Sequence, residues 1–163
     1  MQFEENINYN EDLINEAAFI YWKKTFSSTF IISIVGVVLA LILIYFIDFK
    51  SWISGTFLAL SIISSVIFFS AFFIYRKRSL AIYKQMETPT AKWTINENHI
   101  FVESDAGNSE IKWKMFKDII KSKDIWLLTY KNNSYSVFPI TGISNETLSF
   151  ISKQILENND KNT

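Results

Sequence analysis

The sequence contains no cysteine, a single histidine (His99), four glycines and two prolines among 163 residues. Without cysteine there is no disulfide, no thiolate nucleophile and no thiolate ligand for zinc or an iron–sulfur cluster. One histidine leaves little material for imidazole or metal chemistry, and four scattered glycines cannot form a phosphate-binding loop or a nucleophile elbow. We therefore expect no enzyme activity, no bound metal and no cofactor.

An excess of charge of one sign is also absent, because 16 basic and 16 acidic residues cancel. A neutral chain has no general attraction to nucleic acid, so we do not expect a nucleic-acid partner. Apolar residues, in contrast, make up 49% of the chain and aromatic residues 17%. So much apolar surface excludes a disordered protein.

Two long runs contain no Asp, Glu, Lys or Arg: residues 25–47, which are 23 residues, and residues 51–75, which are 25 residues. At about 1.5 Å per residue, a helix over the first run reaches about 35 Å, more than the roughly 30 Å hydrocarbon layer of a bilayer. Residues 48–50 between the runs suffice for a short outside turn and are too few for a domain. The sequence therefore predicts a membrane protein with a two-helix transmembrane hairpin.

Basic residues next to these runs predict the orientation. Five of them flank the outer ends of the hairpin: Lys23, Lys24, Arg76, Lys77 and Arg78. The connecting turn offers only Lys50, beside Asp48. Because cytoplasmic flanks of membrane helices carry the excess of Lys and Arg, we expect a multi-pass protein with both termini in the cytosol.

Inside the two runs the polar side chains are hydroxyls only, so neither a proton relay nor a charged transport site has a candidate. Small residues that recur four positions apart are candidates for close helix packing: Gly36, Ala40, Gly55, Ala59, Ser61 and Ser65. This spacing serves the packing of the hairpin on itself or the assembly of a homo-oligomer, with or without a hydroxyl-lined pore. We favour packing of the hairpin.

Residues 1–24 predict a cytosolic strand at Phe3–Tyr9 and an amphipathic helix. Asn8 and Glu11 have the spacing of a capping box at the start of that helix. The segment carries five acidic residues and no base before Lys23. Anionic lipid headgroups would repel it, so we expect the helix to dock on protein.

Residues 76–90 predict a helix that leaves the membrane, followed by a linker. We expect the helix to run from Arg76 to Glu87. It should end there because Pro89 has no amide proton and disfavours a helical residue before it.

Beyond residue 90 the apolar pattern changes to alternation, which predicts a small cytosolic α+β domain over 91–158 and a polar tail over 159–163. A helix from about Ser144 or Asn145 should cap its antiparallel sheet. Trp93, Trp113 and Trp126 should lie in the core, because a small sheet needs large aromatic side chains to bury enough area. The expected strands are Lys92–Ile95, His99–Glu103, Glu110–Trp113, Phe116–Lys121, Ile125–Tyr130 and Tyr135–Ile140.

Six short strands leave open sheet edges, which invite unwanted pairing. The N-terminal strand Phe3–Tyr9 should lie on the same side of the membrane. We hypothesise that it adds to an edge of the domain's sheet, which makes the spans an insertion within one fold.

The hairpin, the segment Ile111–Ile119 with its Trp113, the strands around Ile125–Tyr130, and Val137-Phe138-Pro139-Ile140 before a closing helix resemble the YcxB-like family of bacterial membrane proteins. The C-terminal region of that family is similar to bacterial pleckstrin-homology-like (PH-like) domains. The resemblance implies a small β-barrel or sandwich capped by the last helix, in a bacterial inner membrane. It implies no general activity.

The densest basic cluster is a candidate for contact with anionic lipid or a ligand, together with the bases that follow the second run: Arg76, Lys77, Arg78, Lys112, Lys114, Lys117 and Lys121. Each base near an anionic surface contributes about 1 kcal/mol. On alternating strands Lys112 and Lys114 should share a face, as should Lys117 and Lys121. The alternative, a solvated outer face, is the interpretation that we favour.

His99 lies an even number of positions from Glu97 and Glu103, so the three can share one strand face. We favour a surface histidine over a metal site, because no further histidine is available.

These observations together predict a non-catalytic integral membrane protein. Its cytosolic PH-like domain would bind a protein partner or self-associate, and its spans would anchor it in the lipid bilayer or form a homo-oligomer. The alternative is an oligomeric membrane effector or immunity protein, whose cytosolic domain senses a small ligand and rearranges the spans.

Overall fold

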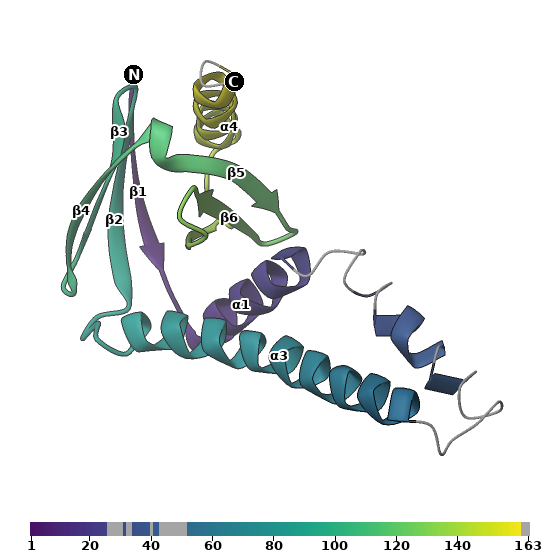
Figure 1. Ribbon diagram of the computed structural model, residues 1–163. Helices are drawn as coiled ribbons and strands as arrows, with labels where there is room; N and C mark the ends of the chain where they lie inside the picture. The colour runs from purple at the N-terminus through teal and green to yellow at the C-terminus, as the bar shows by residue number, and fades with distance from the viewer. Residues whose placement is uncertain (26–30, 32–33, 40, 43–51, 161–163) are drawn as a thin grey trace. The chain divides into compact units, whose positions relative to one another are not determined.

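The computed structural model describes residues 1–25, 31, 34–39, 41–42 and 52–160 (Figure 1). The chain divides into two compact units. One, the domain unit, consists of Met1–Ala17 and Ser79–Thr163; the other, the helical unit, consists of Ala18–Arg78. The domain unit is thus built from both ends of the chain.

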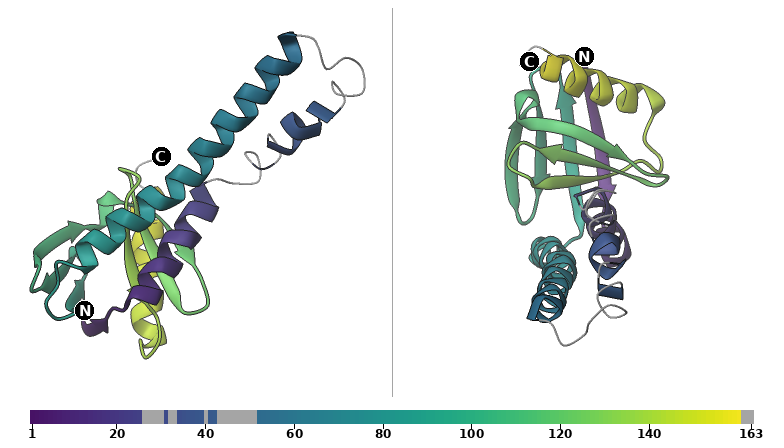
Figure 2. Two further views of the ribbon diagram at one scale, coloured as in Figure 1. Left: turned by 90° about the horizontal axis from the view of Figure 1, so that it is seen from below. Right: turned by 45° about the vertical axis from the view of Figure 1, so that its right-hand side comes forward.

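The domain unit contains two antiparallel sheets. The first has four strands in chain order, β1 (Gln2–Asn8), β2 (Thr90–Asn96), β3 (His99–Ser104) and β4 (Gly107–Lys112). A 3-10 turn, η1 (Trp113–Met115), leads into the second sheet of β5 (Phe116–Lys121), β6 (Ile125–Tyr130) and β7 (Tyr135–Pro139). Helix α4 (Asn145–Asp160) follows and lies across one end of the two sheets (Figure 2). The predicted antiparallel strands and closing helix are confirmed.

The N-terminal strand joins the first sheet. All seven residues of β1 pair with β2, from Gln2 opposite Asn96 to Asn8 opposite Thr90. The amide of Tyr9 then donates to the Pro89 carbonyl at 2.7 Å. The hypothesis that the N-terminal strand adds to an edge of the sheet is confirmed, and everything between β1 and β2 is an insertion between neighbouring strands.

Aromatic and branched side chains fill the space between the two sheets and α4. Trp93 of β2 and Phe138 of β7 pack edge to face with ring centroids 5.1 Å apart, and Phe116, Ile151 and Ile155 are buried with them. Trp93, Trp113 and Trp126 are all buried, as the sequence predicted. Burial of this kind contributes about 1.5–3 kcal/mol for each large apolar side chain.

Helix α1 (Glu11–Thr25) begins later than the capping-box spacing predicted. Asn8 is the last residue of β1, and the cap is Asn10, whose side-chain oxygen accepts the Leu13 amide at 2.8 Å. The interpretation of Asn8 as the cap was wrong, because its backbone belongs to the sheet.

Several other predicted boundaries shift, and hydrogen bonds explain two of the shifts. Helix α3 (Trp52–Tyr83) ends at Tyr83, short of Glu87, because the Gln85 and Met86 amides donate to the Ile82 and Tyr83 carbonyls in tight turns at 3.1 Å each. The strand that was expected to reach Trp113 ends at Lys112. Trp113 instead opens η1, and its indole nitrogen donates to the Asn96 carbonyl at 2.9 Å.

In the helical unit, the second half of α1 packs along α3. The Trp22 indole nitrogen donates to the Phe68 carbonyl at 3.1 Å, and the Tyr21 and Tyr75 rings meet edge to face at 5.1 Å. Within the described residues, one helical segment, Leu58–Tyr83, is long and apolar enough to cross a membrane. Most of its large apolar side chains are exposed, Phe73 to 61% among them, whereas Phe68 and Phe72 are half-buried.

Most of the first predicted span, 25–47, lies outside the described residues. Within its described part, residues 34–39 and 41–42 are helical. The predicted turn 48–50 also lies outside the described residues.

Candidate functional site

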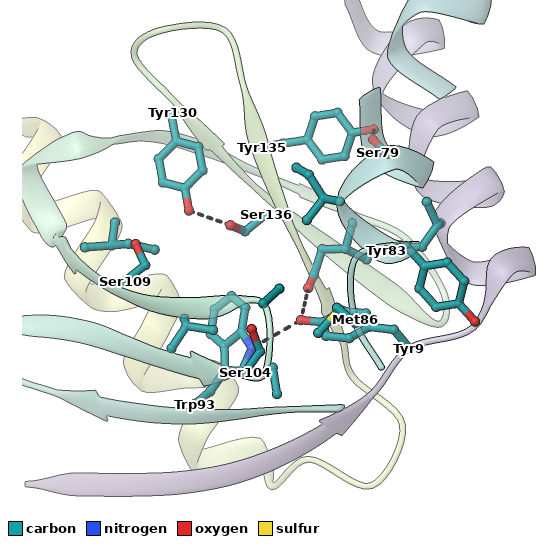
Figure 3. A pocket seen from close by; sticks show the side chains of 17 residues that line it. Tyr9, Ser79, Tyr83, Met86, Trp93, Ser104, Ser109, Tyr130, Tyr135 and Ser136 are labelled. Atoms are coloured by element: carbon teal, nitrogen blue, oxygen red, sulfur yellow. Dashed lines mark hydrogen bonds between the residues drawn. The ribbon is translucent and has the colours of Figure 1, made fainter. Parts of the chain in front are cut away.

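A cavity of about 280 Å³ opens within the domain unit. Tyr9 directly after β1, the start of α1, the last turns of α3 and strands of both sheets surround it (Figure 3). Its lining residues are Tyr9, Ile14, Ser79, Ile82, Tyr83, Met86, Ala91, Trp93, Val102, Ser104, Ala106, Ser109, Ile111, Tyr130, Tyr135, Ser136 and Val137. Because they come from both ends of the chain, the cavity exists only when β1 is in place.

Local structure places α3 at the wall of the cavity. The helix ends at Tyr83, and the turn that follows carries Met86 to the lining. The Ser79 hydroxyl on the last turns of α3 lies 2.8 Å from the Tyr135 hydroxyl at the start of β7. This bond fixes the end of α3 to the second sheet.

Tyr9 joins the two sheets through its hydroxyl. The Trp93 indole nitrogen donates to this oxygen at 3.2 Å, and the hydroxyl donates to the Val137 carbonyl at 3.2 Å. Burial raises the pKa of Tyr9 far above that of an ordinary phenol. The side chain is therefore neutral at any physiological pH.

The second hydroxyl pair in the cavity is formed by Tyr130 of β6 and Ser136 of β7, which hydrogen-bond to each other. Burial also raises the pKa of Tyr130. A hydroxyl both donates and accepts, so this pair can offer a ligand either a proton or a lone pair.

Among the described residues that line the cavity, none is Asp, Glu, Lys, Arg or His. General acid–base catalysis relies on such groups with a pKa near the working pH. The walls are mainly apolar with a few hydroxyls, an arrangement that is typical of pockets for small molecules.

The YcxB-like protein family model matches residues 95–155. The match confirms the resemblance for the part of the chain from the end of β2 into α4. Searches of curated proteins and of solved structures gave no significant match. The YcxB-like region includes Val102, Ile111 and the Tyr130–Ser136 pair of the cavity, whereas Tyr9 and the α3 residues lie outside it.

The predicted basic residues of the YcxB-like region, Lys112, Lys114, Lys117 and Lys121, are exposed. Lys112 ends β4 and Lys114 lies in η1, so strand alternation does not relate them. The pairing of β5 with β6 shifts register between Phe116 and Asp118, at Lys117, which breaks the alternation with Lys121. Both predicted pairings assumed regular strands, which this part of the chain does not have.

Lys121 has a partner that the sequence did not suggest. Its Nζ lies 4.7 Å from the centre of the Trp126 ring, a cation–π geometry. The three bases after the second run, Arg76, Lys77 and Arg78, lie on α3 in the helical unit.

The structure describes five of the six small residues that were candidates for close helix packing: Gly36, Gly55, Ala59, Ser61 and Ser65. A Cβ atom at Gly36 or Gly55 would meet nothing within 4 Å outside its own helix. The Ser65 hydroxyl donates to the Ser61 carbonyl of its own helix at 2.8 Å, and Ala59 is exposed. Ala40 lies outside the described residues.

His99 is a surface residue held by neighbours other than those the spacing suggested. Its Nδ1 lies 3.7 Å from the Glu110 carboxylate on β4, and its Nε2 lies 3.2 Å from the Asn96 amide nitrogen. Glu97 instead binds the N-terminal amine at 3.0 Å. In the described part of the chain, no group of three His, Cys, Asp or Glu residues could hold a metal ion.

Proposed function

We propose that the chain is a non-catalytic, multi-pass protein of the bacterial inner membrane, whose cytosolic domain binds a protein partner or a second copy of itself. The observation that carries the proposal is the pairing of β1 with β2. These strands lie on either side of the whole helical unit in the sequence, and they belong to one folded domain.

This pairing bears on how often the chain crosses a membrane. A domain with polar loops and open sheet edges cannot sit in hydrocarbon, so it lies on one side of the bilayer. The chain between β1 and β2 must then cross an even number of times. Since α3 supplies one candidate span, a second must precede it, and the uncharged run 25–47 has the required length.

The contacts in the helical unit support the same topology. Trp22 lies just before the uncharged run and packs on Phe68, near the end of the other run, with ring centroids 4.5 Å apart. Two helices that begin and end together in this way form an antiparallel hairpin. The flanking bases favour the cytosol for both termini.

The arrangement of the domain supports a PH-like fold, as the family resemblance implies. Four antiparallel strands and three antiparallel strands enclose one core, and a C-terminal helix lies at one end. Folds of this kind serve unrelated functions, so the binding role rests on the uncharged cavity and the scarcity of catalytic side chains.

The absence of native cysteine makes the topology directly testable. Lys50→Cys in the connecting turn should react with a membrane-impermeant maleimide on intact cells. Asn108→Cys, in an exposed position of the domain, should react only after the membrane is permeabilised. Labelling of Lys50→Cys only after permeabilisation would contradict the two-span topology, as would labelling of Asn108→Cys on intact cells.

Self-association through α3 can be tested by cysteine crosslinking at Gly55, where a Cβ atom would meet nothing within 4 Å. If copies pack through α3, Gly55→Cys should form a disulfide-linked dimer in oxidised membranes. Leu60→Cys, an exposed position on the same helix, is the control. Equal crosslinking at both positions would indicate random collision and would contradict a specific oligomer.

The cavity favours a second candidate, the membrane effector or immunity protein that senses a small ligand. Ser79, Ile82 and Tyr83 of α3 line the cavity, and the same continuous helix contains the candidate span. Expression of an effector should depolarise cells when its ligand is present, whereas expression of an anchor should not.

A further inference from the structure

We infer that the cavity of the domain unit binds a small, uncharged and mainly apolar molecule that carries one hydroxyl or carbonyl oxygen. The inference deepens the second candidate function, the membrane effector that senses a small ligand. It rests on that function only for the claim that ligand binding rearranges the spans. Binding itself depends on the domain unit alone, because every lining residue belongs to that unit.

The chemistry of the walls excludes ions. An ionised ligand that leaves water needs a counter-charge or several strong hydrogen bonds, and without them its burial is strongly unfavourable. The described lining offers no charged side chain. The Tyr9 and Tyr130 phenols stay protonated in neutral solution, since burial raises the pKa of both. A neutral ligand loses far less hydration and suits these walls.

The hydroxyl pair of Tyr130 and Ser136 supplies the polar contact. Two hydroxyl protons are present and their mutual bond uses one of them. The other proton can be donated to a ligand oxygen, and the lone pairs can accept from a ligand hydroxyl. Tyr9 is a weaker candidate, because its proton already goes to the Val137 carbonyl.

The remaining walls select for an apolar body. Val102 and Ile111 line the cavity from β3 and β4, and Ile82 and Met86 line it from the end of α3 and the turn after it. Methionine has a flexible, polarisable side chain that adapts to ligands of different shape. These side chains make favourable van der Waals contacts with a hydrocarbon ring or chain.

The size of the cavity limits the ligand. A volume of 280 Å³ equals the share of about nine water molecules at ~30 Å³ each. It is close to the lower end of known ligand pockets, about 300 Å³. One substituted ring fits this space, whereas a two-chain lipid does not.

The test uses the full chain in lipid nanodiscs and three probes that share a 4-ethylphenyl group. These are 4-ethylphenol, the anion 4-ethylbenzoate, and 4-ethyltoluene, in which a methyl group replaces the hydroxyl. Saturation-transfer NMR measures binding, and empty nanodiscs correct for partition into lipid. We expect 4-ethylphenol to bind and 4-ethylbenzoate to bind at least tenfold more weakly. Equal binding of the anion, or no binding of 4-ethylphenol, would overturn the inference.

Paired variants locate the site. Val102→Phe fills the cavity and should abolish binding of 4-ethylphenol. Glu103→Phe adds the same ring at the next residue of β3, which is exposed and does not line the cavity, and should leave binding unchanged. Equal affinity of the two variants for 4-ethylphenol would refute the conclusion that it binds in this cavity.

A milder pair of substitutions covers the case in which Val102→Phe fails to fold. Tyr130→Phe combined with Ser136→Ala removes both hydroxyls and keeps the ring. Loss of one hydrogen bond should weaken the binding of 4-ethylphenol about fivefold and leave the binding of 4-ethyltoluene unchanged. An equal effect on both probes, or no effect on either, would contradict the role of the Tyr130–Ser136 pair.

Failure of this inference and failure of the proposed membrane topology give different results. Maleimide labelling of Lys50→Cys and Asn108→Cys reports only on the crossings. Binding of 4-ethylphenol reports only on the domain unit, so either result can be negative while the other is positive.

Discussion

Truncation of Ile7 on β1 tests whether the N-terminal strand is part of the domain's core. Ile7 is 3% exposed and packs in the same cluster as Trp93 and Phe138. Ile7→Ala removes buried methyl and methylene groups and leaves a cavity, which costs about 2–5 kcal/mol in well-packed cores. We expect about 3 kcal/mol, because the site is almost fully enclosed.

That loss is large for a domain of this size. Natural domains are stable by about 5–15 kcal/mol. For a unit of about 100 residues, each kcal/mol moves the unfolding temperature by about 4–8 °C, so Ile7→Ala should lower it by at least about 12 °C.

The assay is thermal unfolding of the full chain in nanodiscs, followed by the near-ultraviolet circular dichroism of the buried tryptophans. Asn6→Ala is the matched control, since Asn6 is exposed on the same strand, and it should shift the midpoint by less than about 3 °C. Equal midpoints for Ile7→Ala and Asn6→Ala would refute the conclusion that β1 completes the core.

Three smaller predictions use the same unfolding assay. Asn10→Ala removes the cap of α1 and should cost about 1 kcal/mol, whereas Asn10→Asp should cost little. Trp113→Phe loses the bond to the Asn96 carbonyl and should cost at least about 1 kcal/mol; an unchanged midpoint would contradict this. The Thr88 amide holds the pKa of Asp105 below its ordinary value of 3.8. The resulting stabilisation is present above pH 3.8 and is lost as the pH falls through the lower folded value, so Asp105→Asn should lose less stability than the wild type between pH 5 and pH 2.

Much of the secondary structure could be predicted because it depends on neighbouring residues. The bounds predicted for Phe116–Lys121 and Ile125–Tyr130 are those of β5 and β6. The closing helix begins at Asn145, one of the two residues proposed for its start. In each case an apolar period and adjacent turn or capping residues determine the element.

The errors have a different cause. Trp113 fits the end of a strand by its pattern, but its indole bonds to Asn96, which is 17 residues away, and the chain turns there. Asn8 fits a helix cap, but its backbone pairs with Thr90. Strict alternation was assumed for Phe116–Lys121, but the pairing of β5 with β6 shifts register between Phe116 and Asp118. Each contact joins segments that local patterns do not relate.

The cavity could not have been predicted for the same reason. Its hydroxyls come from Tyr9, Ser79, Tyr130 and other residues spread along the chain, and nothing in their spacing brings them together. The nearest sequence signal was the expectation that the N-terminal strand joins the domain. That expectation brings Tyr9 to the sheet without indicating a cavity beside it.

The sequence by itself determined that the chain has two long uncharged runs, an antiparallel β domain with a closing helix, and few residues suited to catalysis. Composition and short-range periodicity are enough for this, since they reflect the solvent around each segment. Only the tertiary structure decided that β1 and β2, which flank the inserted helices in the sequence, pair in one sheet, and that an uncharged cavity lies between Tyr9, the end of α3 and strands of both sheets. Both depend on long-range register, because a strand edge or a helix end carries no local mark of the segment that will cover it.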